Sequence, residues 1–367
     1  MSILTRYILR SLTINYLIAL SAMISLYIVL DMFVNMDEFT EHGYGTLTVL
    51  GNIAGYYGPN MFLHFAQLSG AITLFACMAT IARMRKRNEL TAVLSSGVSL
   101  HRLAVPVIGF GVATSALLAI DTEIVIPHIA DRLARDHDDI DGRRAYEVLF
   151  LPDRDDALFS ADSFSPTTGV IHRLLVLQRD AAGAITGFIE ADRAEWQPPD
   201  PAYPTGAWRL ERGRHTVRTH AADGGLGPRS RKTVTPIALY ASELTPKDIQ
   251  LRQSEHWMAF LSLAELRELE RHHVRSPAKI IQTRHARITA PILGVVLLLL
   301  GLPFFLDRSP VNVLSDGGKC LVACGVCYVA SFVVQRVQGD ATSALPAWIP
   351  IFAFAPIAVV LIDRIRT

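Results

Sequence analysis

Six long apolar runs, separated by polar segments, make up most of the hydropathy pattern of this chain of 367 residues. The runs cover residues 11–36, 57–82, 103–126, 286–306, 318–337 and 346–363. An α-helix rises about 1.5 Å per residue and the hydrocarbon core of a bilayer is about 30 Å thick, so about 20 apolar residues make one crossing. The pattern therefore predicts an α-helical membrane protein with six spans, three before and three after a long polar segment.

The long polar segment between the third and fourth runs contains short stretches typical of β-strands. We predict strands near residues 146–151, 174–177, 187–191, 208–213 and 232–240, with turn residues between them. Short strands at this spacing favour a sandwich or a jelly-roll. Helical signals follow, because Thr245-Pro246 begins one helix and Ser262 with Glu265 forms a capping box for a helix over 263–273.

We therefore expect four parts in this chain. Residues 1–126 form a first transmembrane half, 127–243 a β-jellyroll domain, 244–285 a helical connector and 286–367 a second transmembrane half. Arginines and lysines cluster before the first run, between the second and third, around the turn after the fourth, and at the end of the chain. Because such residues in short loops stay on the cytoplasmic side, we expect both termini in the cytoplasm and the β-domain outside.

The polar island between the second and third runs, residues 83–102, has the features of a short amphipathic helix. It opens with basic residues that favour the cytoplasmic face, and Asn88 is a candidate N-cap. Gly97 is a stop signal and Ser99 can cap the next helix. The residues expected to share one apolar face are Leu90, Val93 and Leu94. This face could enter the groove of a soluble partner or lie on the bilayer surface, and we favour docking.

Composition excludes several functional classes. Half of the residues are hydrophobic and the net charge is +1, which gives no sign of a nucleic-acid partner. No phosphate-binding GxxxxGK[ST] loop, HExxH or GxSxG motif is present, so we expect no catalytic site, cofactor or metal in this chain. The four cysteines lie in apolar runs, and Cys320, Cys324 and Cys327 share a helix face, where close packing is a simpler explanation than a soft-metal site.

Several motifs together resemble the LptF/LptG (YjgP/YjgQ-type) family of lipopolysaccharide-export permeases, over nearly the whole chain. The most specific is Asn88-Glu-Leu-Thr-Ala-Val-Leu-Ser-Ser-Gly-Val-Ser99, which is similar to the coupling helix of that family. Further matches are residues 179–196, which end in Ala-Glu-Trp, Gly206-Ala-Trp-Arg-Leu, Phe260-Leu-Ser-Leu-Ala-Glu-Leu, and Ala347-Trp-Ile-Pro350. The last of these, with the acidic end of the first span, favours an LptG-like chain.

The resemblance implies a transport subunit in the inner membrane of a Gram-negative bacterium, with its β-domain in the periplasm. Two such permeases would pair, bind a dimer of a cytoplasmic ABC-type ATPase (LptB-like), and extract lipopolysaccharide from the membrane. They would pass it to a periplasmic bridge protein (LptC/LptA-like). Glu89 matches the family glutamate that contacts an ATPase arginine, so the ATPase-binding set is Glu89, Leu90, Val93, Leu94, Gly97 and Ser99. A membrane receptor with an external sensing domain is the alternative.

Four residues are candidate contacts for lipopolysaccharide. Asp31 and Asn35 lie near the outer end of the first span, where the family often carries lysines, so phosphate recognition by this span is in question. A carboxylate at membrane depth should face a cavity or a partner group, unless it reaches interfacial water. Arg284 and Arg287 lie where the fourth span begins, and their planar groups suit lipid phosphates or, equally, ordinary lipid head groups.

Overall fold

A computed structural model describes most of the chain, in two compact units. The described residues are 3–34, 46–134, 145–180, 183–201, 203–220, 230–252, 257–272, 277–306, 313–336 and 344–363. One unit, which we call the helical unit, comprises Met1–Ile129 and Met258–Thr367. The other, the β-unit, comprises Ala130–Trp257, so its second boundary falls inside the connector expected over 244–285.

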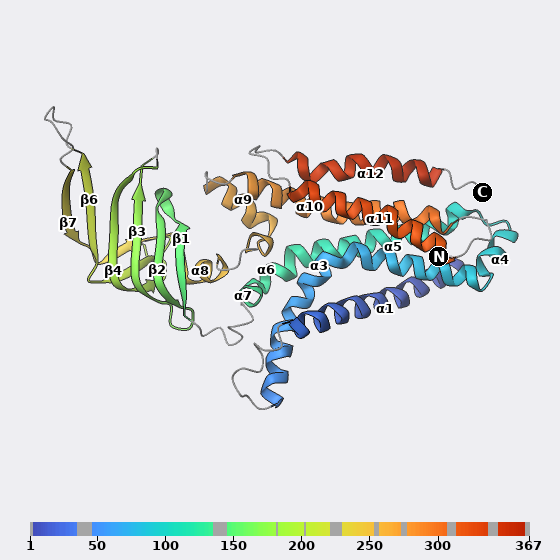
Figure 1. The fold of residues 1–367 in the computed structure, drawn as a ribbon, viewed down its shortest axis with the longest axis horizontal. Coiled ribbons are helices and arrows are strands. Elements are labelled where there is room, and N and C mark those ends of the chain that lie inside the picture. The colour runs from blue at the N-terminus through green and yellow to red at the C-terminus, as the bar shows by residue number, and fades with distance from the viewer. Residues whose placement is uncertain are drawn as a thin grey trace. The chain divides into compact units, whose positions relative to one another are not determined.

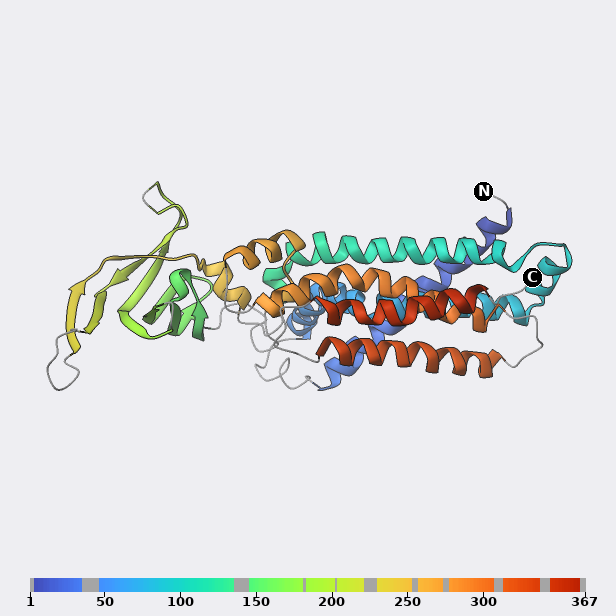
Figure 2. The ribbon, with the colours of Figure 1, turned by 90° about the horizontal axis from the view of Figure 1, so that it is seen from above.

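The helical unit is a bundle of long helices (Figure 1). These are α1 (Ile3–Val34), α3 (Thr46–Lys86), α5 (Leu100–Ile120), α10 (Pro277–Gly301), α11 (Val313–Arg336) and α12 (Leu345–Asp363). Six of the described helices are long and apolar enough to cross a membrane, and each overlaps one of the six expected runs. The first two helices begin before the expected runs. α1 begins at Ile3 and α3 begins at Thr46. The beginning of α1 and the end of α12 lie at the end of the bundle that carries α4 (Glu89–Ser95), as Figure 2 also shows.

Glycines allow α10 to approach its neighbours closely. The Cα of Gly294 lies where a methyl group on Gly70 of α3 would touch it, at 3.6 Å. A methyl group on Gly111 of α5 would overlap the Leu298 side chain, and one on Gly301 would lie 2.6 Å from Leu74. Small residues at helix contacts let backbones pack together without a hydrophobic driving force between helices, so α10 is the central helix of the bundle.

The described residues of the β-unit form eight antiparallel strands. They are β1 (Tyr146–Pro152), β2 (Leu158–Ser165), β3 (Val170–Arg179), β4 (Ile185–Gln197), β5 (Ala207–Glu211), β6 (Arg214–His220), β7 (Ser230–Pro236) and β8 (Leu239–Ala241). The order is β1-β2-β3-β4-β5-β8, and β6 pairs with β4 and β7. The sequence predicted an inserted β-domain correctly. It missed β2 and β6, and the strand expected over 232–240 is two strands, because β7 ends at Pro236.

β4 joins the two parts of this sheet. It has 13 residues, pairs with β3 along most of its length, and pairs with β6 through its first part and β5 through its last part. The aromatic side chains of Phe159 and Phe164, on β2, and of Trp208, on β5, are fully buried in the core of this unit. A buried carboxylate, Asp153, accepts hydrogen bonds from the Tyr240 and Ser242 hydroxyls and the Glu243 N–H. Burial and the Asp153 charge raise the pKa of Tyr240, so its hydroxyl remains a donor.

The helices that follow β8 have the expected caps. In α8 (Pro246–Arg252), the Thr245 hydroxyl accepts from the Asp248 N–H at 3.1 Å while the Asp248 carboxylate accepts from the Thr245 N–H at 3.0 Å. In α9 (Leu263–His272), the Glu265 carboxylate accepts from the Ser262 N–H at 2.7 Å. Both are capping boxes, so the predicted start signals are confirmed. α8 also contributes Ile249 to the core of the β-unit, which explains where the unit boundary falls.

Candidate functional site

α4 is a separate short helix between two sharp turns. Asn88 is the N-cap residue of α4, as predicted, but its backbone is left-handed (φ 59°, ψ 12°) and its side chain makes no capping hydrogen bond. Asparagine tolerates this conformation better than most residues, and here it ends α3 and turns the chain into α4. Gly97, at φ 83°, ends the helix as predicted. The Ser99 hydroxyl accepts from the Arg102 N–H at 3.4 Å, so the expected cap of α5 is confirmed.

The apolar face of α4 packs on the helical unit. Leu90 is 4% exposed and belongs to the bundle core, and Val93 and Leu94 pack against that core. This differs from the expectation that the three side chains are presented to a partner. The amphipathic pattern was interpreted correctly, but the surface that satisfies it is the chain's own bundle. The exposed side of α4 is polar and small, and it consists of Asn88, Thr91, Ala92, Ser95 and Ser96.

Glu89 is held by groups of its own chain. Its Oε2 atom accepts a hydrogen bond from the Tyr7 hydroxyl at 2.7 Å, and its Oε1 atom lies 3.9 Å from an Arg87 nitrogen. The Glu89 side chain is nevertheless 29% exposed, so water or another protein can reach it. Both carboxylate oxygens therefore face a donor already, and neither donor covers the group.

Two further polar contacts join α1 to α3 near α4. The Arg83 guanidinium donates to the Ser11 hydroxyl, and the Asn15 amide donates to the Thr80 hydroxyl at 2.7 Å. Tyr7, Ser11 and Asn15 are spaced by four residues, so they lie on one face of α1. The first half of α1 is thus attached to α3 and α4 by a row of three polar contacts. We call these three residues and their partners the α1 ladder.

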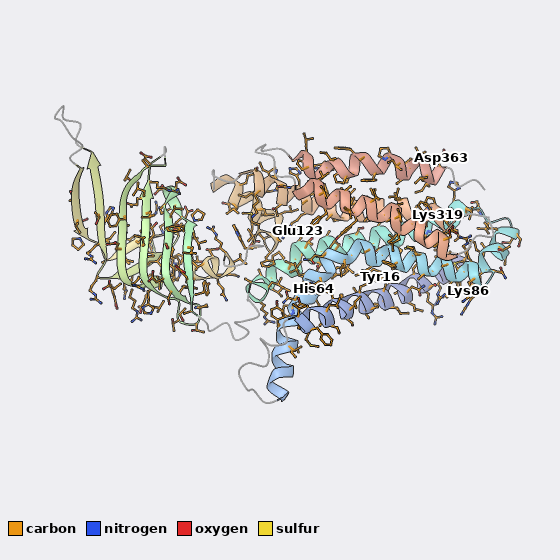
Figure 3. The ribbon with its side chains drawn as sticks, in the orientation of Figure 1. Tyr16, His64, Lys86, Glu123, Lys319 and Asp363 are labelled. Atoms are coloured by element: carbon orange, nitrogen blue, oxygen red, sulfur yellow. The ribbon has the colours of Figure 1, made fainter. Side chains whose placement is uncertain are left out.

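The basic run that precedes α4 divides into two kinds of residue. Arg85 forms an ion pair with Asp316 of α11 at 3.0 Å, and both side chains are largely buried, at 10% and 8% exposure. Lys319 lies 4.0 Å from the same carboxylate but is mostly exposed. Lys86 and Arg87 are exposed. Figure 3 shows Lys86 and Lys319 at the end of the bundle that carries α4. Arg85 therefore ties the two transmembrane halves together, a contact that the local sequence does not indicate.

Comparison with known protein families decides the identity of the chain. The model of the family described as lipopolysaccharide export system permease LptF/LptG matches residues 6–364. The chain belongs to this permease family. No individually curated protein matches the chain. The permease is thus a transport subunit of a lipopolysaccharide export system and a multi-pass membrane protein, and its six helices with an inserted β-domain agree with that assignment.

Near the other end of α1, the permease has a second group of polar side chains. The Asp31 carboxylate accepts a hydrogen bond from the Tyr57 hydroxyl at 2.8 Å, so it has a partner on α3. His64 is buried beside Tyr27, with ring centroids 3.8 Å apart, and its Nδ1 has no hydrogen-bond partner among the described residues. Sequence reasoning missed Tyr27 and His64, which have no local pattern. Asn35, the other residue expected here, lies outside the described residues.

The two arginines expected to meet lipid phosphates have partners within the permease. Arg284 forms an ion pair with Glu270 of α9. Arg287 is 9% exposed and bonds to Glu123, 3.4 Å away, and to two backbone carbonyls. Both guanidinium groups are therefore committed to contacts near α9. This differs from the expectation of free basic groups facing lipid, because Glu270, 14 residues before Arg284, and Glu123, 164 residues before Arg287, fold against them.

The cysteines of the permease are packing residues. Cys320 and Cys324 lie with their sulfur atoms 4.0 Å apart, and a methyl group on Gly301 would lie 2.9 Å from the sulfur of Cys320. All four cysteines are buried. Among the described residues, no group of three histidine, cysteine or acidic side chains is arranged to hold a metal ion. The α11 cysteines pack as small side chains against α10, where the Cys324 sulfur lies 3.6 Å from the Leu297 carbonyl oxygen.

Proposed function

We propose that this permease uses the energy of a separate cytoplasmic ABC-type ATPase dimer to extract lipopolysaccharide from the inner membrane. Family membership supports the transport role, and the absence of a phosphate-binding loop in the sequence supports a separate ATPase. Arginine and lysine in the short loops support the proposal that both termini and α4 are cytoplasmic and that the β-unit is periplasmic. A second LptF/LptG-type permease and a periplasmic bridge protein complete the proposed system.

The observation that carries this proposal is the two-sided character of α4. Leu90 anchors the helix in the bundle core, while the opposite side exposes small polar residues and the edge bearing Glu89. A helix anchored in this way passes a push from a bound partner into the bundle. We therefore assign ATPase contact to Glu89 and the exposed side, and we assign anchoring to Leu90, Val93 and Leu94. Gly97 and Ser99 fix the turn into α5.

Glu89 is the proposed contact for an arginine of the ATPase. A carboxylate can accept two parallel hydrogen bonds from a guanidinium group, which is among the stronger polar contacts in proteins. In the free permease the two oxygens face Tyr7 and Arg87. An arriving arginine would compete with the Tyr7 hydroxyl, and release of Tyr7 would loosen the α1 ladder at its first step. Docking of the ATPase would in this way reach α1.

Apolar surface on the bundle supports further membrane partners. Leu17, Ile18, Leu30 and Phe33 of α1 are at least half exposed, as are several side chains of α11. In a membrane protein such surface is satisfied by lipid tails or by another membrane protein. We propose that it meets the second permease and the acyl chains of the transported lipid, with Asp31 near the path.

Charge reversal at Glu89 tests the proposal. Full-length permease with Glu89→Lys would be purified from its membrane in mild detergent, and bound proteins and lipids would be identified by mass spectrometry. We expect loss of a small ATPase that accompanies the wild-type protein, and loss of ATP-driven lipopolysaccharide release in proteoliposomes. Glu211→Lys, the same charge change on the exposed part of β5, is the matched control. Normal ATPase binding and lipid release with Glu89→Lys would contradict the assignment.

A further inference from the structure

The chain leaves the helical unit once and returns to it once. One polar cluster of the helical unit lies close to both of these points. It leaves the helical unit after Ile129 and returns at Met258. Just before it leaves, α5 changes into a five-residue π-helix, Asp121–Val125. Single turns of π-helix are uncommon and occur often at functional sites. Just after it returns, a short 3-10 turn ends at Ala259 and α9 begins at Leu263.

Two side chains connect these segments. The Glu123 carboxylate, on the π-helix, accepts from the Leu263 N–H with Oε2 at 2.9 Å and lies 3.4 Å from Arg287 through Oε1. Arg287, on α10, also donates to the Thr122 carbonyl at 3.0 Å and to the Ala259 carbonyl. Figure 3 shows Glu123 near the end of the bundle away from α4. One carboxylate and one guanidinium thus link α5, α10, the returning chain and the start of α9.

The chemistry of each group suits this linking role. The planar guanidinium has donors pointing in several fixed directions, so one arginine can hold two carbonyls and a carboxylate at once. The carboxylate uses its two oxygens on different partners, and one of them is an N–H at the start of a helix, where a negative charge is favourable. Arg287 is almost fully buried, so these contacts occupy a group that has little access to lipid.

We propose that Glu123 and Arg287 form a clamp that fixes both chain crossings to α5 and α10, so that movement of these helices is passed to the β-unit. They are positioning residues for lipid delivery, and this inference rests on the proposed export function. Arg287 then acts on the substrate only through the position of the β-unit. A binding site for lipid phosphate at Arg287 would instead need the guanidinium to release its carbonyl partners.

The test uses the full-length permease in its complex with the ATPase, reconstituted in nanodiscs. Spin labels at position 292 of α10 and position 185 of β4, both occupied by exposed isoleucines, report the distance between the two units. In Arg287→Met we expect the distance distribution to become at least about twice as broad. We expect lipopolysaccharide delivered per ATP hydrolysed to fall at least about fivefold, the size of a typical coupling effect. Arg209→Met, at an exposed arginine of β5, is the control for loss of an arginine.

A second variant covers the case in which Arg287→Met does not accumulate. Glu123→Gln keeps the shape of the side chain but removes its charge, and it should give a smaller effect of the same kind. Because both residues act in one clamp, the double variant should broaden the distance distribution and lower the yield per ATP no more than Arg287→Met alone. An unchanged distance distribution and yield per ATP in both single variants would overturn the clamp. The export proposal is judged separately, since ATPase binding by Glu89→Lys does not depend on this cluster.

Discussion

Replacing Tyr7 with phenylalanine should tighten the binding of the ATPase, although it removes a contact. Tyr7 donates to Glu89, the residue proposed to receive an arginine of the ATPase. If the two donors compete for one carboxylate, part of the binding free energy of the ATPase is offset by breaking the hydrogen bond between Tyr7 and Glu89. Tyr7→Phe removes that competitor and leaves the ring in place, so Glu89 is available at once.

The size of the effect follows from the exposure of the pair. A hydrogen bond to a charged group contributes about 1.5–3 kcal/mol when it is sheltered from water. Tyr7 is 42% exposed and the Glu89 side chain is 29% exposed, so we take a value below this range, about 1 kcal/mol. Because about 1.4 kcal/mol corresponds to a tenfold change in affinity, we expect the dissociation constant for the ATPase to fall about fivefold.

The assay is a titration of purified ATPase against the permease in nanodiscs, with binding measured by biolayer interferometry. Tyr27→Phe is the matched control, because Tyr27 is also on α1 and is 39% exposed but lies far along the helix from Glu89. It should leave the dissociation constant unchanged. Glu89→Gln combined with Tyr7→Phe should show less gain than Tyr7→Phe alone, since the receiving charge is gone. Equal or weaker binding by Tyr7→Phe would refute competition at Glu89.

Three further changes test the packing described above, each by thermal unfolding in detergent with binding or transport measured alongside. Leu90→Ala should destabilise the permease by about 2–5 kcal/mol and loosen α4, whereas exposed Thr91→Ala should change stability by less than about 0.5 kcal/mol. Gly301→Val should cost about 1–3 kcal/mol by pushing on Leu74 of α3 and on the α11 cysteines, whereas Gly325→Ala, which meets no neighbour within 4 Å, should not destabilise. Asp153→Asn should cost about 1–3 kcal/mol, because one of the two acceptor oxygens becomes an NH2 donor that faces the donors of the β-unit.

Much of the fold could be predicted from the sequence, because the signals are local. Apolar runs of about 20 residues identify helices that cross a membrane, and Ser262 with Glu265 identifies a helix start. The missed strands lack such signals. β6 (RHTVRTH) is polar along most of its length, and β2 (LFSADSFS) has small polar residues where a pattern of large apolar ones would be expected. The expected starts of the first two spans were too late, because α1 and α3 begin well before the most apolar part of each helix.

The candidate site was predicted less completely, because its geometry depends on residues far apart in the chain. The α4 sequence predicts a short amphipathic helix with a stop at Gly97, and this is confirmed. Which surface receives the apolar face cannot be read from seven residues. Tyr7 is 82 positions from Glu89, and Arg287 is 164 positions from Glu123, so neither contact leaves a local pattern. The arginines of α10 were interpreted as facing lipid, whereas they form ion pairs with Glu270 and Glu123.

The pairing of β4 with β3, β5 and β6 has a consequence for local unfolding of the β-unit. The buried cluster of this unit draws on β1 to β5, β8 and α8, and no described residue of β6 or β7 belongs to it. Among the described residues, the β6–β7 hairpin is held by backbone pairing to the first part of β4 and by a hydrogen bond of 2.7 Å between the His215 ring and the Gln178 side chain of β3. Its amide protons should therefore exchange with solvent well before those of β3 and the last part of β4. The hairpin can detach while the rest of the sheet keeps its core, which gives the β-unit a side that opens at low free-energy cost.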